Sequence, residues 1–293
     1  MRNILLGTDW GSDVDDVVAV RILARAHKLG KINLVGIAIN HCMENSVTSL
    51  EGFLNTEGVF DVPIGIDKNA HFGKKPTYQN ILCEYARKYR TNDDVVDAVR
   101  LYREILANKT EKVDIVEIGF LQALSALLKS GADDISDKTG AELIKQKVNK
   151  LWIMAGKWDE QGGKEFNFSC NEITRAAASE VCAFCPVPIT FLGFEVGCDV
   201  VTGTRLKNDD ILYKAMCAYG ARNGRFSWDP MLATLALTGD EQKAGYNVVR
   251  GKASVDADTG LNYFEKYDNA LHAYVTRKYS AEYYKDIIDE LIG

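Results

Sequence analysis

The amino-acid sequence predicts an α/β fold: a single domain with an open, mostly parallel sheet, helices on both faces and a Rossmann-like core. Short, nearly continuous apolar runs alternate with longer stretches that have apolar residues at helical spacing. The 293 residues, 46% of them hydrophobic, are enough for one large α/β domain. No low-complexity linker or internal repeat divides residues 1–293. Alternation of strands and helices implies right-handed crossovers between parallel strands.

Five apolar runs are the predicted strands. Most of them lack the alternation of polar and apolar residues that marks a sheet with one face in water. Helices are expected to cover both sides of such strands. The predicted strands are residues 3–8, 32–39, 113–118, 150–155 and 187–194.

Four stretches have the apolar spacing of amphipathic helices. The third ends before Gly131, a residue that commonly terminates helices, and the fourth begins with Ser280 as a predicted N-cap. The apolar positions of the first two are Val47, Leu50, Phe53 and Leu54, then Val95, Val99, Tyr102 and Leu106; the other two are residues 121–128 and 280–291.

The overall charge and the cysteine pattern argue against several classes of protein. A formal net charge of −6 disfavours a general nucleic-acid binder, whose surface would be basic. The compact basic run Arg87 to Arg90 is expected on the solvated face of a helix. Cys182 and Cys185 form a C-x-x-C string without a second pair, which favours buried thiols over a zinc or redox site.

No targeting or membrane segment is expected. Strand residues begin at Asn3, where a signal peptide would otherwise stand. No apolar run reaches the ~18 residues of a membrane span. We therefore expect a cytoplasmic protein with neither a membrane nor a nucleic acid as its partner.

Three loose segments, 67–80, 156–166 and 222–229, are rich in Gly, Lys, Asn or Gln. They lie beside predicted strand ends. In an open α/β sheet the ligand crevice lies at the carboxyl ends of the strands. We therefore expect these loops to be functional.

Four aspartates are crowded between the first strand and the following helix: Asp9, Asp13, Asp15 and Asp16. Such charges repel one another unless a cation or water neutralises them, and Asp oxygens suit Ca²⁺ or Mg²⁺ rather than Zn²⁺. An acidic turn that caps the helix is the alternative, but capping explains only one or two of the four. The cluster therefore predicts a hard-metal site.

The loop alone offers too few oxygens for Ca²⁺, which takes about six to eight. Further ligands must come from other strand ends. The acidic candidate is Asp229, which precedes Pro230 at a loop-to-helix junction. Taken alone, Asp229 is also consistent with a simple helix cap.

The order of these motifs resembles that of the inosine-uridine preferring nucleoside hydrolases. Their opening motif D-x-D-P-G-x-D-D has a variant, D-x-G-[ST]-D-x-D-D, that is similar to Asp9 through Asp16 here. Further matches follow in order and extend the resemblance to about residue 235. They are the strand and turn Val113–Gln122, Leu151–Gly156 for a strand ending in M-G-G, Glu165-Phe166-Asn167 for E-F-N, and Trp228-Asp229-Pro230 where the family has H-D-P.

The resemblance implies a nucleoside hydrolase-like domain over residues 1–293 that binds Ca²⁺ and forms a homodimer or homotetramer. The implied metal ligands are Asp9, Asp16, the main-chain carbonyl of Ile118, and Asp229. Because the third ligand is a carbonyl, an isoleucine can stand where the family often has threonine.

The resemblance also assigns residues to the sugar. Asp15 is implied to bind the ribose hydroxyls, Glu165 and Asn167 to hold the sugar, and Met154 to pack against it. Asn40, or alternatively Asn45, is a further candidate ribose contact. The other interpretations are that Asn167 is a turn residue and that Met154 fills the core.

The implied activity is hydrolysis of the N-glycosidic bond of ribonucleosides, as in purine salvage. The transition state resembles an oxocarbenium ion, so the enzyme needs an activated water and a way to neutralise the leaving base. Metal coordination lowers the pKa of the water, and Asp9 is implied to take its proton as the general base. Acidic crowding favours the positive charge that develops on the sugar.

Three departures from the family pattern concern the loop and the leaving base. Gly7 replaces the family's first Asp, and Asp13 has no counterpart in the shorter motif. Trp228 replaces a His that helps the base leave, and an indole cannot protonate a leaving group. Stacking by Trp228 would favour purines, although core packing is the other interpretation. The alternative acids are His41, His71 and Tyr78, each of which could instead be a surface residue.

Two other functions are open at this point. The first is a non-catalytic or weakly active, Ca²⁺-dependent protein that binds ribose or nucleosides, which Trp228 favours and the retained Asp9 opposes. The second is a phosphohydrolase of the haloacid dehalogenase type. That class has a D-x-D motif at the end of the first strand, and Asp9-Trp10-Gly11 lacks the second aspartate.

Overall fold

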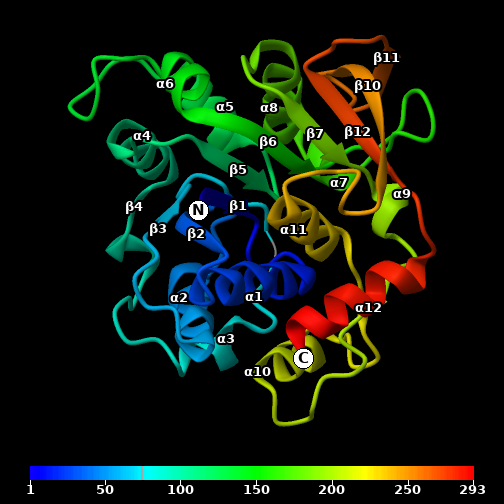
Figure 1. Ribbon diagram of the computed structural model, residues 1–293. Coiled ribbons are helices and arrows are strands. Elements are labelled where there is room, and N and C mark those ends of the chain that lie inside the picture. Colours follow the sequence, from blue (N-terminus) through cyan, green and yellow to red (C-terminus); the bar gives the residue numbers. More distant parts are fainter. Residues whose placement is uncertain (74) are drawn as a thin grey trace.

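The computed structural model describes residues 1–73 and 75–293. Within them, ten strands form one sheet in the order β11-β10-β12-β7-β6-β5-β1-β2-β3-β4 (Figure 1). From β12 to β4 all neighbours are parallel, and β10 pairs antiparallel with both β12 and β11 at one edge. The predicted open, mostly parallel sheet is confirmed. A separate two-stranded ribbon joins β8 (Val201–Thr202) to β9 (Arg225–Phe226).

The five predicted strands are all present, with ends that differ by three residues or fewer. The structure adds the short strands β3 and β4 and the C-terminal strands β10 to β12. The ten strands are β1 Arg2–Thr8, β2 Ile32–Ile39, β3 Ile64–Ile66, β4 Val96–Asp97, β5 Val113–Glu117, β6 Val148–Met154, β7 Ile189–Leu192, β10 Tyr246–Val255, β11 Asn262–Lys266 and β12 His272–Arg277.

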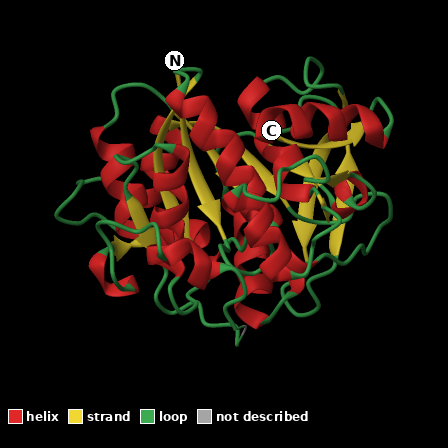
Figure 2. Cartoon of the chain, turned by 90° about the horizontal axis from the view of Figure 1, so that it is seen from below, coloured by secondary structure: helices red, strands yellow, loops and turns green. Residues whose placement is uncertain are grey.

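Helices cover both faces of this sheet, as predicted (Figure 2). One apolar core joins α1, α2, α11 and α12 to the sheet, and the other joins α4, α5, α6 and α8 to its opposite face. The helices are α1 Asp15–Lys28, α2 Ser46–Glu57, α3 Gln79–Cys83, the 3₁₀ turn η1 Asn92–Asp94, α4 Ala98–Asn108, α5 Gln122–Lys129, α6 Gly140–Lys147, α7 Phe166–Ser169, α8 Glu172–Phe184, α9 Phe194–Gly197, α10 Ile211–Tyr219, α11 Trp228–Thr238 and α12 Ala281–Ile292.

Two local predictions are wrong. Val95 precedes α4, because Asp97 caps that helix by accepting the Val99 N–H at 2.8 Å. Arg87 to Arg90 are not helical, since the Glu51 carboxylate accepts main-chain N–H groups of this segment and holds it as a loop.

The prediction for the two neighbouring cysteines is confirmed. Cys182 and Cys185 are buried free thiols, and burial raises the pKa of Cys185 to about 11. No helix in the described part of the chain is both long and apolar enough to cross a membrane.

The sheet order brings the predicted site segments together. Strands β6, β5 and β1 are adjacent, and their carboxyl ends lead into Ala155, Ile118 and Asp9. Helix α11 packs against α1 on one face, which carries its first turn to the same edge. The predicted crevice therefore lies at the carboxyl ends of the strands.

Candidate active site

One cavity of about 280 Å³ collects all the predicted site residues except Asn40. Among the described residues, its lining also includes side chains that sequence reasoning did not assign to the site: a serine, three aromatic residues and an arginine. The full lining is Asp9, Ser12, Asp13, Asp15, Asp16, Ile118, Met154, Glu165, Phe166, Asn167, Phe194, Tyr219, Arg225, Trp228 and Asp229. Two of the three loose segments, 156–166 and 222–229, contribute to it.

Three buried carboxylates form the polar floor of this cavity. Asp15 and Asp16 begin α1, Asp229 lies in the first turn of α11, and one oxygen from each lies within 4.8 Å of the others. Burial, reinforced by mutual repulsion, raises the pKa of all three carboxyl groups well above the usual range. Removing them from water without a counter-charge costs free energy, so the arrangement suits a cation.

The donor set fits a hard divalent ion. Asp16 accepts a hydrogen bond from the Thr8 hydroxyl with one oxygen, while its Oδ2 is buried and has no partner among the described residues. An unpartnered buried carboxylate oxygen is rare unless an ion or water completes it. All the clustered donors are oxygens, which match Ca²⁺ or Mg²⁺.

Asp15 and Asp9 occupy different positions in this floor. Asp15 belongs to the three-carboxylate cluster, although the sequence assigns it to the sugar, and its Oδ2 accepts the Asp229 main-chain N–H at 3.3 Å. Asp9 is 5% exposed and lines the same cavity, just beyond the carboxyl end of β1. Both residues thus line the space that a bound molecule would occupy.

Asn167 ties the ends of β5 and β6 together. Its side-chain amide donates to the Met154 carbonyl at 3.0 Å and lies 3.4 Å from the Ile118 carbonyl. The Ile118 oxygen therefore faces the cavity side of the sheet edge. Asn167 is buried and holds both strand ends, so it is more than a surface turn residue.

Glu165 is fixed by the backbone around it. Its carboxylate accepts N–H groups from Asn167 at 2.8 Å and Gly156 at 3.0 Å, and it caps the short helix α7. Burial raises the pKa of Glu165 to about 7 against the opposing effect of these N–H donors. The E-F-N segment therefore has a defined shape before any ligand binds.

Asn40 is the predicted site residue that does not line the cavity. It is fully buried, its Oδ1 accepts the Phe120 N–H at 3.0 Å, and its amide donates to Glu117 at 3.3 Å. Those bonds use its carboxamide to join the ends of β2 and β5. The alternative, Asn45, lies outside the cavity as well and donates to Asn80 at 3.1 Å.

Glu117 explains the glycine at position 7. A Cβ on Gly7 would lie 1.8 Å from a Glu117 carboxylate oxygen, so only glycine leaves room for that side chain. Tyr102 donates a hydrogen bond to the same carboxyl group, and burial raises the pKa of Glu117 to about 8. A buried acid from β5 thus fills the space beside β1.

Asp13, which had no predicted role, forms an ion pair with Arg225 from the β9 ribbon, 2.9 Å from the guanidinium Nε. The Arg225 guanidinium lies 5.5 Å from the centre of the Trp228 ring. Trp228 stacks on Phe194 at 5.3 Å between ring centres and donates its N–H to the Phe194 carbonyl at 2.8 Å. Trp228 and Phe194 thus form an aromatic wall of the cavity. The cation beside this wall, Arg225, is already paired with Asp13.

The three alternative acids lie outside the cavity lining. His71 is exposed, as one interpretation expects. Tyr78 is buried and its hydroxyl donates to the Asp13 carbonyl at 2.9 Å, so it supports the acidic loop. His41 is buried as well, and its Nδ1 lies 2.7 Å from the hydroxyl of Ser12, which does line the cavity.

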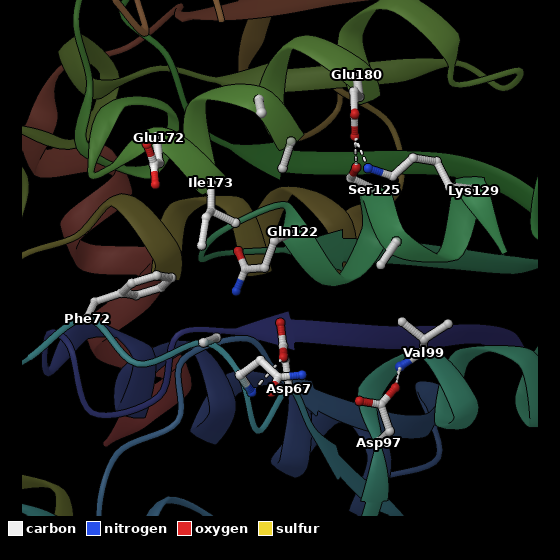
Figure 3. A pocket seen from close by; sticks show the side chains of 15 residues that line it. Asp67, Phe72, Asp97, Val99, Gln122, Ser125, Lys129, Glu172, Ile173 and Glu180 are labelled. Atoms are coloured by element: carbon white, nitrogen blue, oxygen red, sulfur yellow. Dashed lines mark hydrogen bonds and ion pairs between the residues drawn. The ribbon is translucent and has the colours of Figure 1, made fainter. Parts of the chain in front are cut away.

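A second cavity, of about 590 Å³, lies between α5, α8 and the loop after β3 (Figure 3). Asp67 and Gln122 point into it, and the Lys129–Glu180 ion pair closes one end at 2.6 Å. None of the predicted site residues lines it. The loose segment 67–80 contributes here instead of to the first cavity.

Scans against family models and against curated proteins give no match. Solved structures do match over nearly the whole chain. An inosine-uridine preferring nucleoside hydrolase from Bacillus anthracis is 16% identical, with a TM-score of 0.70 over 100% of this chain and 99% of the other. A purine-preferring ribonucleoside hydrolase from Gardnerella vaginalis is 14% identical, with a TM-score of 0.71 over 99% and 98%.

A third similar structure is the type III effector protein XopQ complexed with adenosine diphosphate ribose. It is 15% identical, with a TM-score of 0.70 over 99% of this chain and 93% of the other. At these identities the likenesses show the fold alone. The chain has the nucleoside hydrolase fold that its motifs predicted.

Proposed function

We propose that the protein is a metal-dependent ribohydrolase that cleaves the N-glycosidic bond of ribonucleosides, releasing free base and ribose. The observation that carries this proposal is a single cavity that combines a buried carboxylate cluster with Glu165 and Asn167 at neighbouring strand ends. The nucleoside hydrolase fold supports it, because similar structures include hydrolases of both inosine-uridine and purine preference.

Ca²⁺ is the proposed ion, held by Asp9, Asp16, the Ile118 carbonyl and Asp229. When bound, the ion would lower the pKa of a water molecule and fix a sugar diol. Asp15 is kept for the ribose hydroxyls, since one of its oxygens already accepts the Asp229 N–H and this fixes its orientation.

The chain's own groups supply the remaining chemistry. Asp9 takes the proton of the attacking water as general base. Glu165 and Asn167 hold the sugar, and Met154 packs against it at the end of β6. The surrounding carboxylates favour the oxocarbenium-like charge that develops as the glycosidic bond breaks.

A purine preference follows from the aromatic wall. The N–H of Trp228 is committed to the Phe194 carbonyl, which leaves ring surface rather than a hydrogen-bond donor for the base. Phe166 and Phe194 are 48% and 40% exposed at the same cavity. The larger ring system of a purine gains more from such contacts than a pyrimidine does.

The experiment is chromatographic detection of free base from a panel of ribonucleosides with Ca²⁺ and with chelator. We expect chelator-sensitive release, faster for inosine and adenosine than for uridine and cytidine. Asp9→Ala should abolish release, while Asp67→Ala, in the second cavity, serves as the matched control and should retain it.

The second candidate is a Ca²⁺-dependent nucleoside-binding protein with little or no turnover. Trp228 favours it, because an indole cannot protonate a departing base. Calcium-dependent nucleoside binding without release of any base would support this candidate and contradict the hydrolase. A homodimer or homotetramer and a cytoplasmic location stay predictions, the first of which light scattering tests.

A further inference from the structure

Ser12 and His41 form a hydrogen-bonded pair at the cavity wall. The Ser12 hydroxyl lies 2.7 Å from His41 Nδ1, and Ser12 lines the cavity while His41 lies behind it, fully buried. The His41 ring stacks on Phe72 at 5.1 Å and meets the edge of Phe120 at 5.9 Å. This packing fixes the imidazole so that Nδ1 stays aimed at the hydroxyl.

Ser12 is linked through its chain neighbour to the residues beside Trp228. Ser12 precedes Asp13, whose carboxylate binds Arg225, and the Arg225 guanidinium lies 5.5 Å from the Trp228 ring centre. Glu165, assigned to the sugar, comes from a different segment beyond β6. A riboside whose sugar meets Glu165 would place its base toward the wall of Ser12 and Trp228.

A departing nucleobase needs a proton, and Trp228 cannot give one because its N–H is used by Phe194. An imidazole is the side chain best suited to donate a proton near neutral pH. Ser12 contacts both His41 and the cavity, and a hydroxyl can accept one proton while donating another.

We propose that Ser12 and His41 form a proton relay that protonates the departing nucleobase. Ser12 is the catalytic residue that touches the base, and His41 acts through it. This inference rests on the proposed hydrolase function. It assigns the leaving-group acid to a pair of residues at a position different from that of Trp228.

Each proton that moves in this relay has a donor and an acceptor. The C1′–N bond breaks and its electron pair stays on the base nitrogen, which takes the Ser12 hydroxyl proton. Ser12 regains a proton from imidazolium Nδ1 of His41, leaving a neutral imidazole. Water bonds to C1′ and loses its proton to Asp9. Release of that proton to solvent and uptake of one by His41 restore the starting state.

The test uses two substrates that differ in their need for a proton. Guanosine leaves as an anion unless it is protonated, whereas 7-methylguanosine, cationic in mildly acidic buffer, leaves as a neutral base. Ser12→Ala and His41→Asn should each lower kcat for guanosine about 10²-fold or more. With 7-methylguanosine, kcat of the same variants should stay within about threefold of the wild-type value, because this base leaves without needing a proton.

His71→Asn is the matched control, because it deletes an exposed imidazole instead of the buried one. It should leave kcat for guanosine and for 7-methylguanosine unchanged. Cleavage of 7-methylguanosine by each variant shows that it is folded. Equal losses on both substrates, or no loss on guanosine, would overturn the relay. Wild-type protein that cleaves only 7-methylguanosine overturns the relay alone, whereas protein that cleaves neither overturns the proposed function as well.

Discussion

Replacing Asp229 by Asn should stabilise the metal-free protein and weaken its response to calcium. The clustered oxygens lie within 4.8 Å of one another, and two full charges at that outer limit repel by about 3 kcal/mol at an effective dielectric constant of about 20. Partial protonation already relieves part of this repulsion, so we expect metal-free Asp229→Asn to gain about 1–2 kcal/mol near neutral pH.

The pH dependence of this gain has a definite sign. Burial and repulsion raise the pKa of Asp229, so the folded protein retains a proton that the unfolded chain has lost. Stability is therefore lost as pH rises from the ordinary carboxyl range through the raised pKa. The advantage of Asp229→Asn should be small in acid and grow toward neutral pH.

Calcium should make the wild-type protein more stable than Asp229→Asn. At a calcium concentration 100 times the Kd, wild-type protein gains about 2.7 kcal/mol, and a variant missing one ligand should gain less than about 1 kcal/mol. Urea unfolding with calcium or chelator measures both quantities. Asp67→Asn, which changes a half-buried acid outside the cluster, is the control and should keep the full calcium response.

Two outcomes would refute this reasoning. One is a metal-free Asp229→Asn protein less stable than wild type, which would mean that the carboxylates do not repel one another as their packing implies. The other is an undiminished calcium response in the variant, which would exclude Asp229 from the ion's ligands.

The remaining predictions concern stability away from the metal. His272 is buried and accepts the Ala253 N–H at 3.1 Å, and burial lowers the pKa of its imidazole to about 4. The unfolded chain therefore binds a proton first as pH falls from 6.5 toward 4. His272→Asn, which keeps an acceptor, should remove about 2 kcal/mol of the acid-induced loss in urea unfolding, and an unchanged pH profile would contradict the assignment. Gly7→Ala should cost about 2 kcal/mol of unfolding free energy because its Cβ would meet Glu117. Glu117→Ala should lower the unfolding free energy less in the Gly7→Ala protein than in wild type. Equal losses in the two proteins would argue against a contact between the methyl group added at position 7 and Glu117.

The parallel core could be predicted because its strands are buried on both faces. Ile32 to Ile39 reads as a nearly unbroken apolar run, and the structure gives this strand the same bounds. Of the C-terminal strands, β10 and β11 escaped prediction because they lie at one edge of the sheet. In β10 and β11 buried residues alternate with exposed charged ones such as Lys252 and Glu265, so no apolar run marks them.

The acidic floor of the site could be predicted because its residues share short motifs at strand ends. Asp13 could not, since its partner Arg225 is 212 residues away and only folding brings them together. The family resemblance offers Asn40 as a ribose contact, but tertiary hydrogen bonds use its carboxamide inside the sheet edge. Ser12 belongs to the acidic loop that the sequence singles out. Its hydrogen bond to His41 could not be predicted, because it depends on how two loops pack together.

The most direct test of the central claim is the calcium dependence of base release from inosine. We predict that hypoxanthine and ribose appear in equal amounts, that chelator stops their release, and that added calcium restores it. Calcium binding that stabilises the protein while no nucleoside is cleaved would contradict the claim. So would cleavage that chelator leaves untouched.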